Sequence, residues 1–538
     1  MSGIAGLVIA PVLLPLLAGA GMLLLNGERH RAVVAGLNLA ATLALVCIAA
    51  VLLAMSDTGT RAVYRLGNWP APFGIVLVLD RLSALMLLLT NVLALASVVF
   101  SLARWHRAGA HFHSLFQFLL MGLNGAFLTG DLFNLFVFFE LLLAASYGLL
   151  LHGSGLTRVK AGLHYIVVNL AASLLFLIGV SLIYGVTGTL NMADLAARMP
   201  TVAPESRGLL EAGAGVLAVA FLLKAGMWPL SLWLPTAYAA ASPPVASIFA
   251  IMTKVGVYIV LRLSLLLFGE GAGASAGFGS DWLLWGGLAT IVFGTVGTLA
   301  SQDTARLGGF SVLVSSGTVL AATGIGQAGV TSGALFYLVS STLGIGAFFL
   351  LVELIERGRE PGADVIAVTR EAYGDEDEAD EAEGDVGIAI VATMGLLGVA
   401  FIGCALVIAG LPPLSGFIAK FALLAAALNP GDRSGAVPGS AWALLVMLIL
   451  SGFATLIAMS RAGIRIFWAS PERTVPRVRA IEMAPVMFLL TICVAQTILA
   501  GPVIRFMQAT AQSIHAPAGY ISDVLQTGAQ GSRQVEGK

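Results

Sequence analysis

Apolar runs of about 20 residues recur along almost the whole 538-residue chain, and they limit its possible folds more than any other feature. A run of this length crosses the hydrocarbon core of a bilayer as one α-helix, which pairs all of its own backbone groups. The pattern therefore predicts an all-α polytopic membrane protein with about 14 transmembrane helices. We place them near residues 4–25, 32–53, 75–102, 112–129, 132–151, 163–186, 211–234, 244–267, 282–300, 308–325, 332–355, 388–428, 440–468 and 484–508. The twelfth run is too long for one straight helix.

The composition agrees with a membrane protein and excludes several other classes. Hydrophobic residues make up 58% of the chain and charged residues 11%, which is too little charge to coat a soluble protein of this size. A net charge of -1 gives no basis for binding nucleic acid. Cys47, Cys404 and Cys493 stand singly in apolar runs, so we expect small buried hydrophobes rather than a disulfide or a metal site. No nucleophile motif, phosphate loop or cofactor fingerprint appears, which predicts a protein that is not an enzyme and has no cofactor.

Loop charge predicts the orientation of the helices. If the N-terminus lies outside, the inside loops carry 15 Lys and Arg residues and the outside segments carry 7. The positive-inside rule then places both termini in the periplasm of a bacterial inner membrane. Two segments are plainly aqueous: an acidic cytoplasmic loop at 356–385, which we interpret as solvated, and a polar tail from about Gln512. Within that tail Pro517–Leu525 could form a short surface helix.

Four charged residues stand deep inside apolar runs, namely Glu140, Lys224, Lys254 and Lys420. Each would cost about 2.5–3.5 kcal/mol at the centre of a membrane helix, so such groups usually face a cavity and mark an ion or proton path. The alternative is a side chain that snorkels to the interface. For Glu140, Lys224 and Lys254, which lie well inside their runs, the sequence favours function. Snorkelling is favoured for three arginines nearer to run ends, which are Arg81, Arg262 and Arg505.

Prolines interrupt two of the spans that carry these lysines. Pro229 follows Lys224, and Pro412 and Pro413 precede Lys420; each removes a helix hydrogen bond. The two broken spans are the seventh and the twelfth, five spans apart, and an odd offset reverses the direction of the chain. Two inverted five-helix repeats with ion sites at broken helices near the midplane would give this pattern. We therefore divide the chain into residues 1–111, a first repeat at 112–267, a second at 282–468 that includes the acidic loop, and a final helix with the tail at 469–538.

Three stretches carry a family resemblance. They read TGDLFNLFVFFELLLAASYGLLLHG (Thr129–Gly153), KAGMWPLSLWLPTAYAAASPPVASIFAIMTKVGVY (Lys224–Tyr258) and AGLPPLSGFIAKFALL (Ala409–Leu424). They resemble the antiporter-like family shared by Mrp (also Mnh or Pha) cation/proton antiporters and the proton-pumping membrane subunits of respiratory complex I. The stretch DLFNLFVFFE and the loop ERGREPGADVIAVTREAYG resemble the D subunit of the Pha branch, which is associated with potassium/proton exchange.

The resemblance implies roles for the four charged residues. In that family a glutamate on the fifth span pairs with a lysine on the broken seventh span, and the matching residues here are Glu140 and Lys224. Lys254 matches a lysine on the eighth span that continues the row, and Lys420 matches an ionisable group on the broken twelfth span. The resemblance also implies work within an assembly of other antiporter subunits in the lipid bilayer, with H⁺ and K⁺ or Na⁺ as the transported ions.

One departure from the family lies on the eleventh span, where many relatives carry His or Lys. Here FYLVSSTLGIGAFFLL offers Ser340, Ser341 and Gly344, and its one titratable group is Tyr337. We expect water held by the hydroxyls, or by His164 of the sixth span, to bridge the Ser340–Gly344 gap between Lys254 and Lys420. For His164 a structural role is the favoured alternative.

A mechanism and its rivals follow from these residues. Burial disfavours a charged lysine and a nearby carboxylate favours it, so Lys224 could hold a proton beside Glu140 and release it toward Lys254 when the two separate. A proton-pumping subunit of a redox complex would use the same residues and remains the alternative function. A transport-inactive scaffold is a further rival, but a scaffold would gain from replacing these charges with apolar residues.

Overall fold

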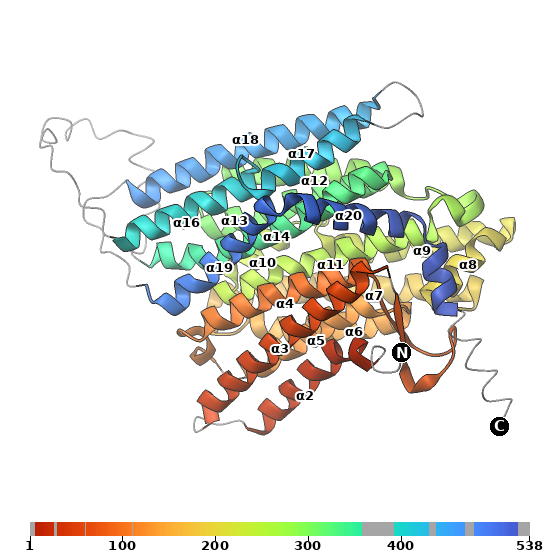
Figure 1. Ribbon diagram of the computed structural model, residues 1–538, viewed down its shortest axis with the longest axis horizontal. Helices are drawn as coiled ribbons and strands as arrows, with labels where there is room; N and C mark the ends of the chain where they lie inside the picture. Colours follow the sequence, from red (N-terminus) through yellow and green to blue (C-terminus); the bar gives the residue numbers. More distant parts are fainter. Residues whose placement is uncertain are drawn as a thin grey trace, which may run out of the picture.

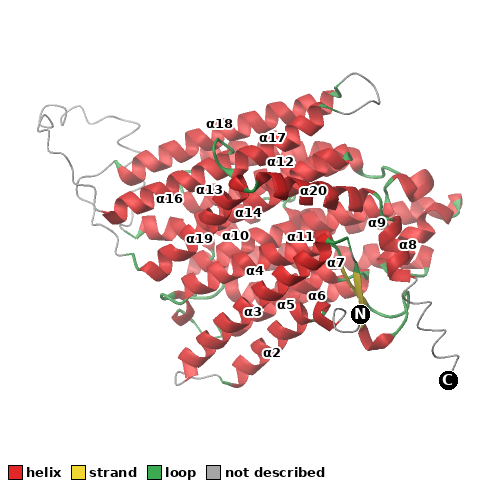
Figure 2. Ribbon diagram, in the orientation of Figure 1, coloured by secondary structure: helices red, strands yellow, loops and turns green. Residues whose placement is uncertain are grey.

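The structure is a computed structural model that describes residues 6–25, 30–59, 61–109, 111–357, 392–429, 437–468 and 478–525. Apart from one small hairpin, its ordered elements are helices, most of which run side by side across the view (Figures 1 and 2). The α-helices are α2 (Ala10–Leu24), α3 (Arg31–Asp57), α4 (Arg81–Ser101), α5 (Phe112–Leu128), α6 (Leu132–Leu150), α7 (Leu156–Thr187), α8 (Met192–Arg198), α9 (Pro204–Ala225), α10 (Leu234–Ala240), α11 (Pro243–Leu267), α12 (Ser280–Ala300), α13 (Thr304–Ile325), α14 (Ala328–Glu356), α16 (Ala392–Ala409), α17 (Ser415–Leu428), α18 (Gly439–Phe467), α19 (Ala480–Ile498) and α20 (Ala500–His515). The short 3-10 helices are η2 (Leu66–Asn68), η3 (Trp105–Arg107), η4 (Met199–Thr201) and η5 (Glu270–Ser275).

The described helices confirm a polytopic membrane protein. Twelve of them are long and apolar enough to cross a membrane, and α2, α5 and α17 are shorter apolar helices. The acidic loop predicted at 356–385 lies almost wholly outside the described residues. On the outer helices large apolar side chains are exposed, as a hydrocarbon environment requires. Cys404 and Cys493 are buried as predicted, whereas Cys47 is exposed on α3 because it lies on such an outward face.

The prediction of a third helix beginning at residue 75 is wrong. Strand β2 (Val76–Leu79) pairs antiparallel with β1 (Ala62–Arg65), with Ala62 opposite Leu79. The helix begins only at Arg81, because the Asp80 carboxylate accepts a hydrogen bond from the Ser83 backbone N–H at 2.8 Å and the Ser83 hydroxyl caps the Asp80 backbone in return. The predicted all-α architecture thus needs one correction, a two-stranded hairpin.

The predicted last span, 484–508, is divided in the structure. Helix α19 ends at Ile498, and α20 begins at Ala500 on the other side of a bend at Leu499. Pro502 lacks the backbone N–H that would bond to the carbonyl of Ile498, so one straight helix cannot continue through it. Helix α20 then packs against α14 and α11 rather than completing a span.

The tail beyond α20 packs into the core instead of lying on the surface. Residues 518–525 are helical, and Tyr520 and Val524 are 5% and 1% exposed. The side chain of Asp523 forms an ion pair of 3.0 Å with Arg61, next to the β-hairpin. The short helix suggested by the sequence therefore exists, but one of its faces is buried.

A proline in α2 explains an otherwise puzzling buried asparagine. Pro15 inside α2 has no N–H for the carbonyl of Pro11. The side-chain amide of Asn124 on α5 donates to this carbonyl at 3.0 Å, and Asn91 on α4 donates to Asn124 at 3.3 Å. A backbone group without a partner is costly in hydrocarbon, so these asparagines satisfy a defect that the proline creates.

Helices α11 and α14 form the centre of the molecule and are buried along their length. Helix α14 contacts α11 and α13 on one side and α16, α17 and α19 on the other. It therefore lies between Lys254 on α11 and Lys420 on α17. Any proton transfer between these two lysines has to pass α14.

Candidate functional site

Both predicted helix interruptions are present in the structure. Helix α9 ends at Ala225, Gly226 follows with φ +71°, and the chain resumes helical structure at Leu234 of α10 after a cis Trp228–Pro229 bond. Only glycine adopts a positive φ of this kind without strain. Lys224 therefore stands in the last turn of α9, where unpaired helix carbonyls favour a positive charge.

The second interruption has the same chemistry. Helix α16 ends at Ala409, Gly410 has φ +75°, and the Pro412–Pro413 bond is cis before α17 begins at Ser415. The Lys420 ammonium, on α17, donates a hydrogen bond of 2.8 Å to the carbonyl of Ala409. A lysine thus satisfies a carbonyl that the end of α16 leaves free.

Glu140 and Lys224 lie near one another without forming a close ion pair. Lys224 is 6% exposed, and its ammonium lies 4.9 Å from the centre of the Phe139 ring. The Ser173 hydroxyl of α7 donates a short hydrogen bond to Glu140. Among the described residues no ion pair within 4.0 Å joins Glu140 to Lys224, and Lys224 Nζ has no hydrogen-bond partner there.

Lys254 is the most deeply buried of the four charged residues, at 1% exposure. Its ammonium donates to the hydroxyls of Ser315 at 2.7 Å and Ser316 at 3.2 Å, both on α13. Ser315 in turn shares a hydrogen bond of 2.7 Å with Ser341 on α14. The two α13 serines are absent from the sequence-based predictions, because isolated serines in an apolar helix carry no distinctive pattern.

A second pair of hydroxyls joins α14 to α17. Ser340 shares a hydrogen bond of 2.7 Å with Ser415, the first residue of α17. The Tyr337 ring lies 6.0 Å from Lys420 Nζ, and the Tyr337 backbone carbonyl accepts from Ser341 at 2.6 Å. Among the described residues no hydrogen bond joins Ser341 to Ser340, so the two hydroxyl pairs approach from Lys254 and Lys420 but stay separate.

His164 is not part of this arrangement. It is exposed on α7, whereas Tyr165, Asn169 and Ser173 of the same helix are buried. The suggested relay through His164 therefore has no support in the geometry.

A cavity of about 230 Å³ lies beside Lys420. Gly410 and Gly452 line it, and a Cβ atom at Gly410 would approach the Lys420 side chain to 2.6 Å. The remaining lining is apolar and comes mainly from α17 and α18, with Ala409 of α16 and Leu411 beside it. The glycines therefore leave the ammonium room to move.

Arg262 differs most from its predicted position. It is 5% exposed rather than snorkelling, and its guanidinium forms a 2.8 Å ion pair with Asp80. It also donates to the Tyr258 hydroxyl at 2.9 Å, and the Tyr520 ring lies 5.5 Å from it. The pair joins the start of α4, the end of α11 and the C-terminal helix, which are far apart in sequence.

Comparisons with known proteins place this site in a family. Residues 129–445 match the family described as NADH:quinone oxidoreductase/Mrp antiporter, transmembrane region. The D subunit of a probable K(+)/H(+) antiporter from Rhizobium meliloti (strain 1021) is 61% identical over 534 residues, covering 98% of this chain and 99% of that protein. This chain belongs to the family of Mrp antiporter D subunits.

Another relative and two solved structures are also similar to this chain over nearly its whole length. The D subunit of the Na(+)/H(+) antiporter of Alkalihalophilus pseudofirmus is 33% identical over 528 residues, with 97% of this chain and 99% of that protein covered. A chain of the Mrp complex from Dietzia sp. DQ12-45-1b aligns with a TM-score of 0.80 at 26% identity, covering 98% and 100%. A chain of the membrane-bound sulfane sulfur reductase shares the fold, with a TM-score of 0.81 at 22% identity over 97% and 100%. The predicted family is confirmed: an antiporter subunit is a secondary transporter, not an enzyme.

Proposed function

We propose that this D subunit carries protons in a multisubunit antiporter that exchanges K⁺ for H⁺ in a bacterial inner membrane. The whole-length relative at 61% identity is named for K⁺/H⁺ exchange, and the one named for Na⁺/H⁺ exchange is only 33% identical. The observation that carries the proposal is a row of three buried lysines, two at helix interruptions and one bound by serine hydroxyls that reach the central helix. Buried charges in a membrane are costly and are retained for ion transfer.

Proton uptake would begin at Glu140 and Lys224. Their separation beyond 4.0 Å allows two arrangements, one with the pair closed and one with it open. Closing favours a protonated Lys224, and opening favours release of its proton toward Lys254. Cation movement elsewhere in the complex would drive exchange by stabilising one arrangement over the other.

Transfer across the centre would use hydroxyls instead of a titratable side chain. Lys254 can give a proton to Ser315 while Ser315 passes its own proton to Ser341, so Ser315 gains one proton and loses one. Ser341 would in turn give its own proton to water in the gap between the two hydroxyl pairs, and that water would give a proton to Ser340. Ser340 and Ser415 offer the matching pair toward Lys420. The Tyr337 ring lies 6.0 Å from Lys420 Nζ, near the end of this path.

The inverted five-helix repeats also belong to this proposal. The first would comprise α5, α6, α7, the interrupted α9–α10 and α11, and the second α12, α13, α14, the interrupted α16–α17 and α18. In each set the fourth member is the broken one, and it carries the lysine. With α16 and α17 counted as one span, α2 and α5 bring the total to 14. The domain boundaries 112–267 and 282–468 follow these sets.

Cation-dependent proton exchange tests the proposed function. We expect inverted vesicles that contain the whole complex to lose an imposed pH gradient on addition of K⁺, and to respond less to Na⁺ and Li⁺. A fluorescent pH probe measures the response, and vesicles from cells without the complex are the control. Proton movement that requires an electron donor and ignores all three cations would instead support the redox alternative, in which the chain serves a quinone-linked pump.

The proposed orientation has its own test. With 14 spans and both ends in the periplasm, a periplasm-specific reporter such as alkaline phosphatase should be active when fused after Lys538. The same reporter should be inactive when fused at the acidic loop near residue 375. The opposite pair of results would show that the orientation is reversed.

A further inference from the structure

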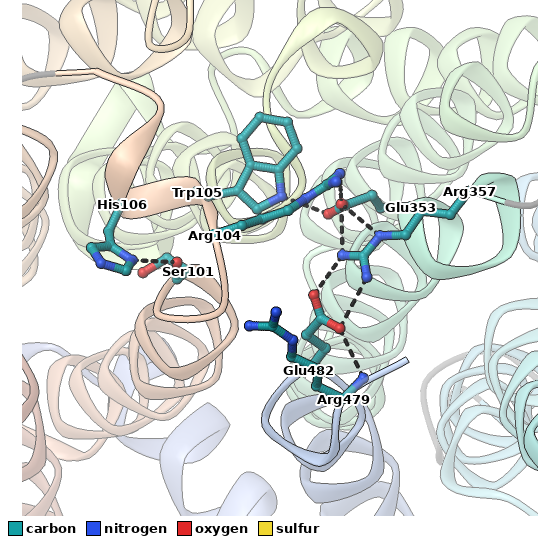
Figure 3. Close-up of polar contacts among 8 residues, drawn as sticks. All are labelled: Ser101, Arg104, Trp105, His106, Glu353, Arg357, Arg479 and Glu482. Carbon is teal, nitrogen blue, oxygen red and sulfur yellow. Dashed lines mark hydrogen bonds and ion pairs between the residues drawn. The ribbon is translucent and has the colours of Figure 1, made fainter. Parts of the chain in front are cut away.

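A cluster of charged side chains around two buried carboxylates lies at the C-terminal end of α14 (Figure 3). Glu353 near the end of α14 and Glu482 in the first turn of α19 have side chains only 9% and 3% exposed. Arg357 lies between them and pairs with both, at 2.8 Å and 2.6 Å. We call Arg104, Trp105, Glu353, Arg357 and Glu482 the carboxylate clasp.

The clasp ties three distant segments together. The Trp105 indole of η3 donates to Glu353 at 2.6 Å, and Arg104 forms a further short ion pair with the same carboxylate. The backbone N–H of Arg479 donates to Glu482 at 3.0 Å. Burial disfavours the charged form of Arg357, but its hydrogen bonds to Glu482 and Glu353 outweigh this and raise the pKa of Arg357. The end of α14 is thus fixed to the segment after α4 and to the start of α19.

The clasp and the central hydroxyls lie on one rigid element. Glu353 follows Ser341 by twelve residues, about 18 Å along the axis, and α14 is continuous between them with no internal proline. Ser341 and Ser340 each make a 2.7 Å hydrogen bond to a neighbouring helix. Bonds between hydroxyls have donor–acceptor distances of about 2.5–3.0 Å, so a displacement of α14 by about half an ångström would take them out of this range.

Stability alone does not account for the clasp. Buried ion pairs can often be replaced by well-packed apolar residues without loss of stability, because desolvation cancels much of their attraction. What apolar residues cannot supply is a fixed position for one helix end, which directional hydrogen bonds from two arginines and an indole do provide.

We propose that the carboxylate clasp is a positioning device that holds α14 where its serines complete the hydroxyl links between the two lysine sites. Glu353 acts through Ser340 and Ser341 and does not touch the proton path itself. This inference rests on the proposed function, since it assigns the clasp to the central transfer step.

Proton exchange by variants of the whole complex tests the inference. Glu353→Gln keeps the shape but removes the charge that binds Arg104 and Arg357, and we expect exchange to fall by about fivefold to thirtyfold with normal assembly. Trp105→Phe removes one hydrogen bond and leaves an aromatic ring, so we expect a loss of about twofold to fivefold even if Glu353→Gln fails to assemble. Asp303→Asn is the matched control, because Asp303 is an exposed carboxylate that only caps α13, and it should leave exchange unchanged.

A double-mutant cycle separates positioning from a general structural role. Ser341→Ala should itself reduce exchange, and Glu353→Gln, or Trp105→Phe in its place, added to Ser341→Ala should reduce it little further. If the two losses multiply, or if Ser341→Ala has no effect while Glu353→Gln does, the clasp does not act through the hydroxyls and the inference is wrong. The proposed function is tested separately, by substitutions of Glu140 and Lys224.

Discussion

Replacing Lys224 with alanine, or Glu140 with glutamine, is expected to lower cation-dependent proton exchange by about a hundredfold or more while the complex still assembles. Lys224 is the titratable group at the first helix interruption, and Glu140 is the carboxylate whose charge acts on it. Without Lys224 the site has no group that can carry the proton. Without Glu140 no nearby negative charge changes how tightly Lys224 holds it. Dissipation of a pH gradient in vesicles, scaled to the amount of complex on immunoblots, measures the loss.

Two matched substitutions control for the general effect of removing a charge. Lys160 on α7 and Glu205 on α9 are exposed, so Lys160→Ala and Glu205→Gln remove the same groups away from the lysine row. Both should exchange protons as the unmodified complex does. Normal potassium- or sodium-dependent flux in Lys224→Ala or Glu140→Gln would eliminate the proposed mechanism.

The second large effect is expected on stability. Asp80→Asn supplies an amide oxygen in place of the carboxylate oxygen that caps α4, but leaves the buried Arg262 guanidinium without its carboxylate. Removing one partner of a buried ion pair costs about 3–5 kcal/mol. Because Tyr520 also packs on Arg262, the C-terminal helix should loosen as well. Thermal unfolding of the purified complex in detergent should show a clearly lower Tm.

A double substitution tests whether the lost stability comes from leaving the Arg262 charge buried without a partner. Asp80→Asn with Arg262→Met removes both charges and keeps an apolar side chain of similar length, so most of the lost stability should return. Asp57→Asn, at a carboxylate 62% exposed that faces Arg81 at 4.0 Å, should have little effect because screened pairs contribute little. Equal Tm values for Asp80→Asn and the unmodified complex would show that Arg262 does not need its partner.

The two helix interruptions show which features of the fold can be predicted from local sequence. Pro229 and the Pro412–Pro413 pair predicted breaks in two spans, and both breaks are present, because a missing N–H acts on its own helix whatever the surroundings. Pro502 divides the last predicted span in the same way. This break was not predicted, because the residues around Pro502 form one continuous apolar run. The β-hairpin was missed because Val76–Leu79 is as apolar as the helix that follows.

For the charged residues, the sequence predicted their positions but not their partners. The positions of Glu140, Lys224, Lys254 and Lys420 within membrane helices could be predicted because hydropathy places each inside a span. Their partners could not, since Ser315 and Ser316 come from a helix other than that of Lys254, and serine is common in membrane helices for packing alone. Arg262 was misplaced for the same reason, as nothing in its own helix reveals that Asp80 lies beside it.

The sequence by itself thus determined the membrane-spanning architecture, the broken helices, the buried lysines and the family, because hydropathy, proline chemistry and family motifs are properties of local segments. Only the tertiary structure decided which groups meet. It brought Ser315 to Lys254 and Ser341 to Ser315, placed His164 on an exposed face of α7, and joined Glu353 to Glu482 through Arg357. Such contacts depend on how helices distant in sequence pack, and packing is a property of the whole chain.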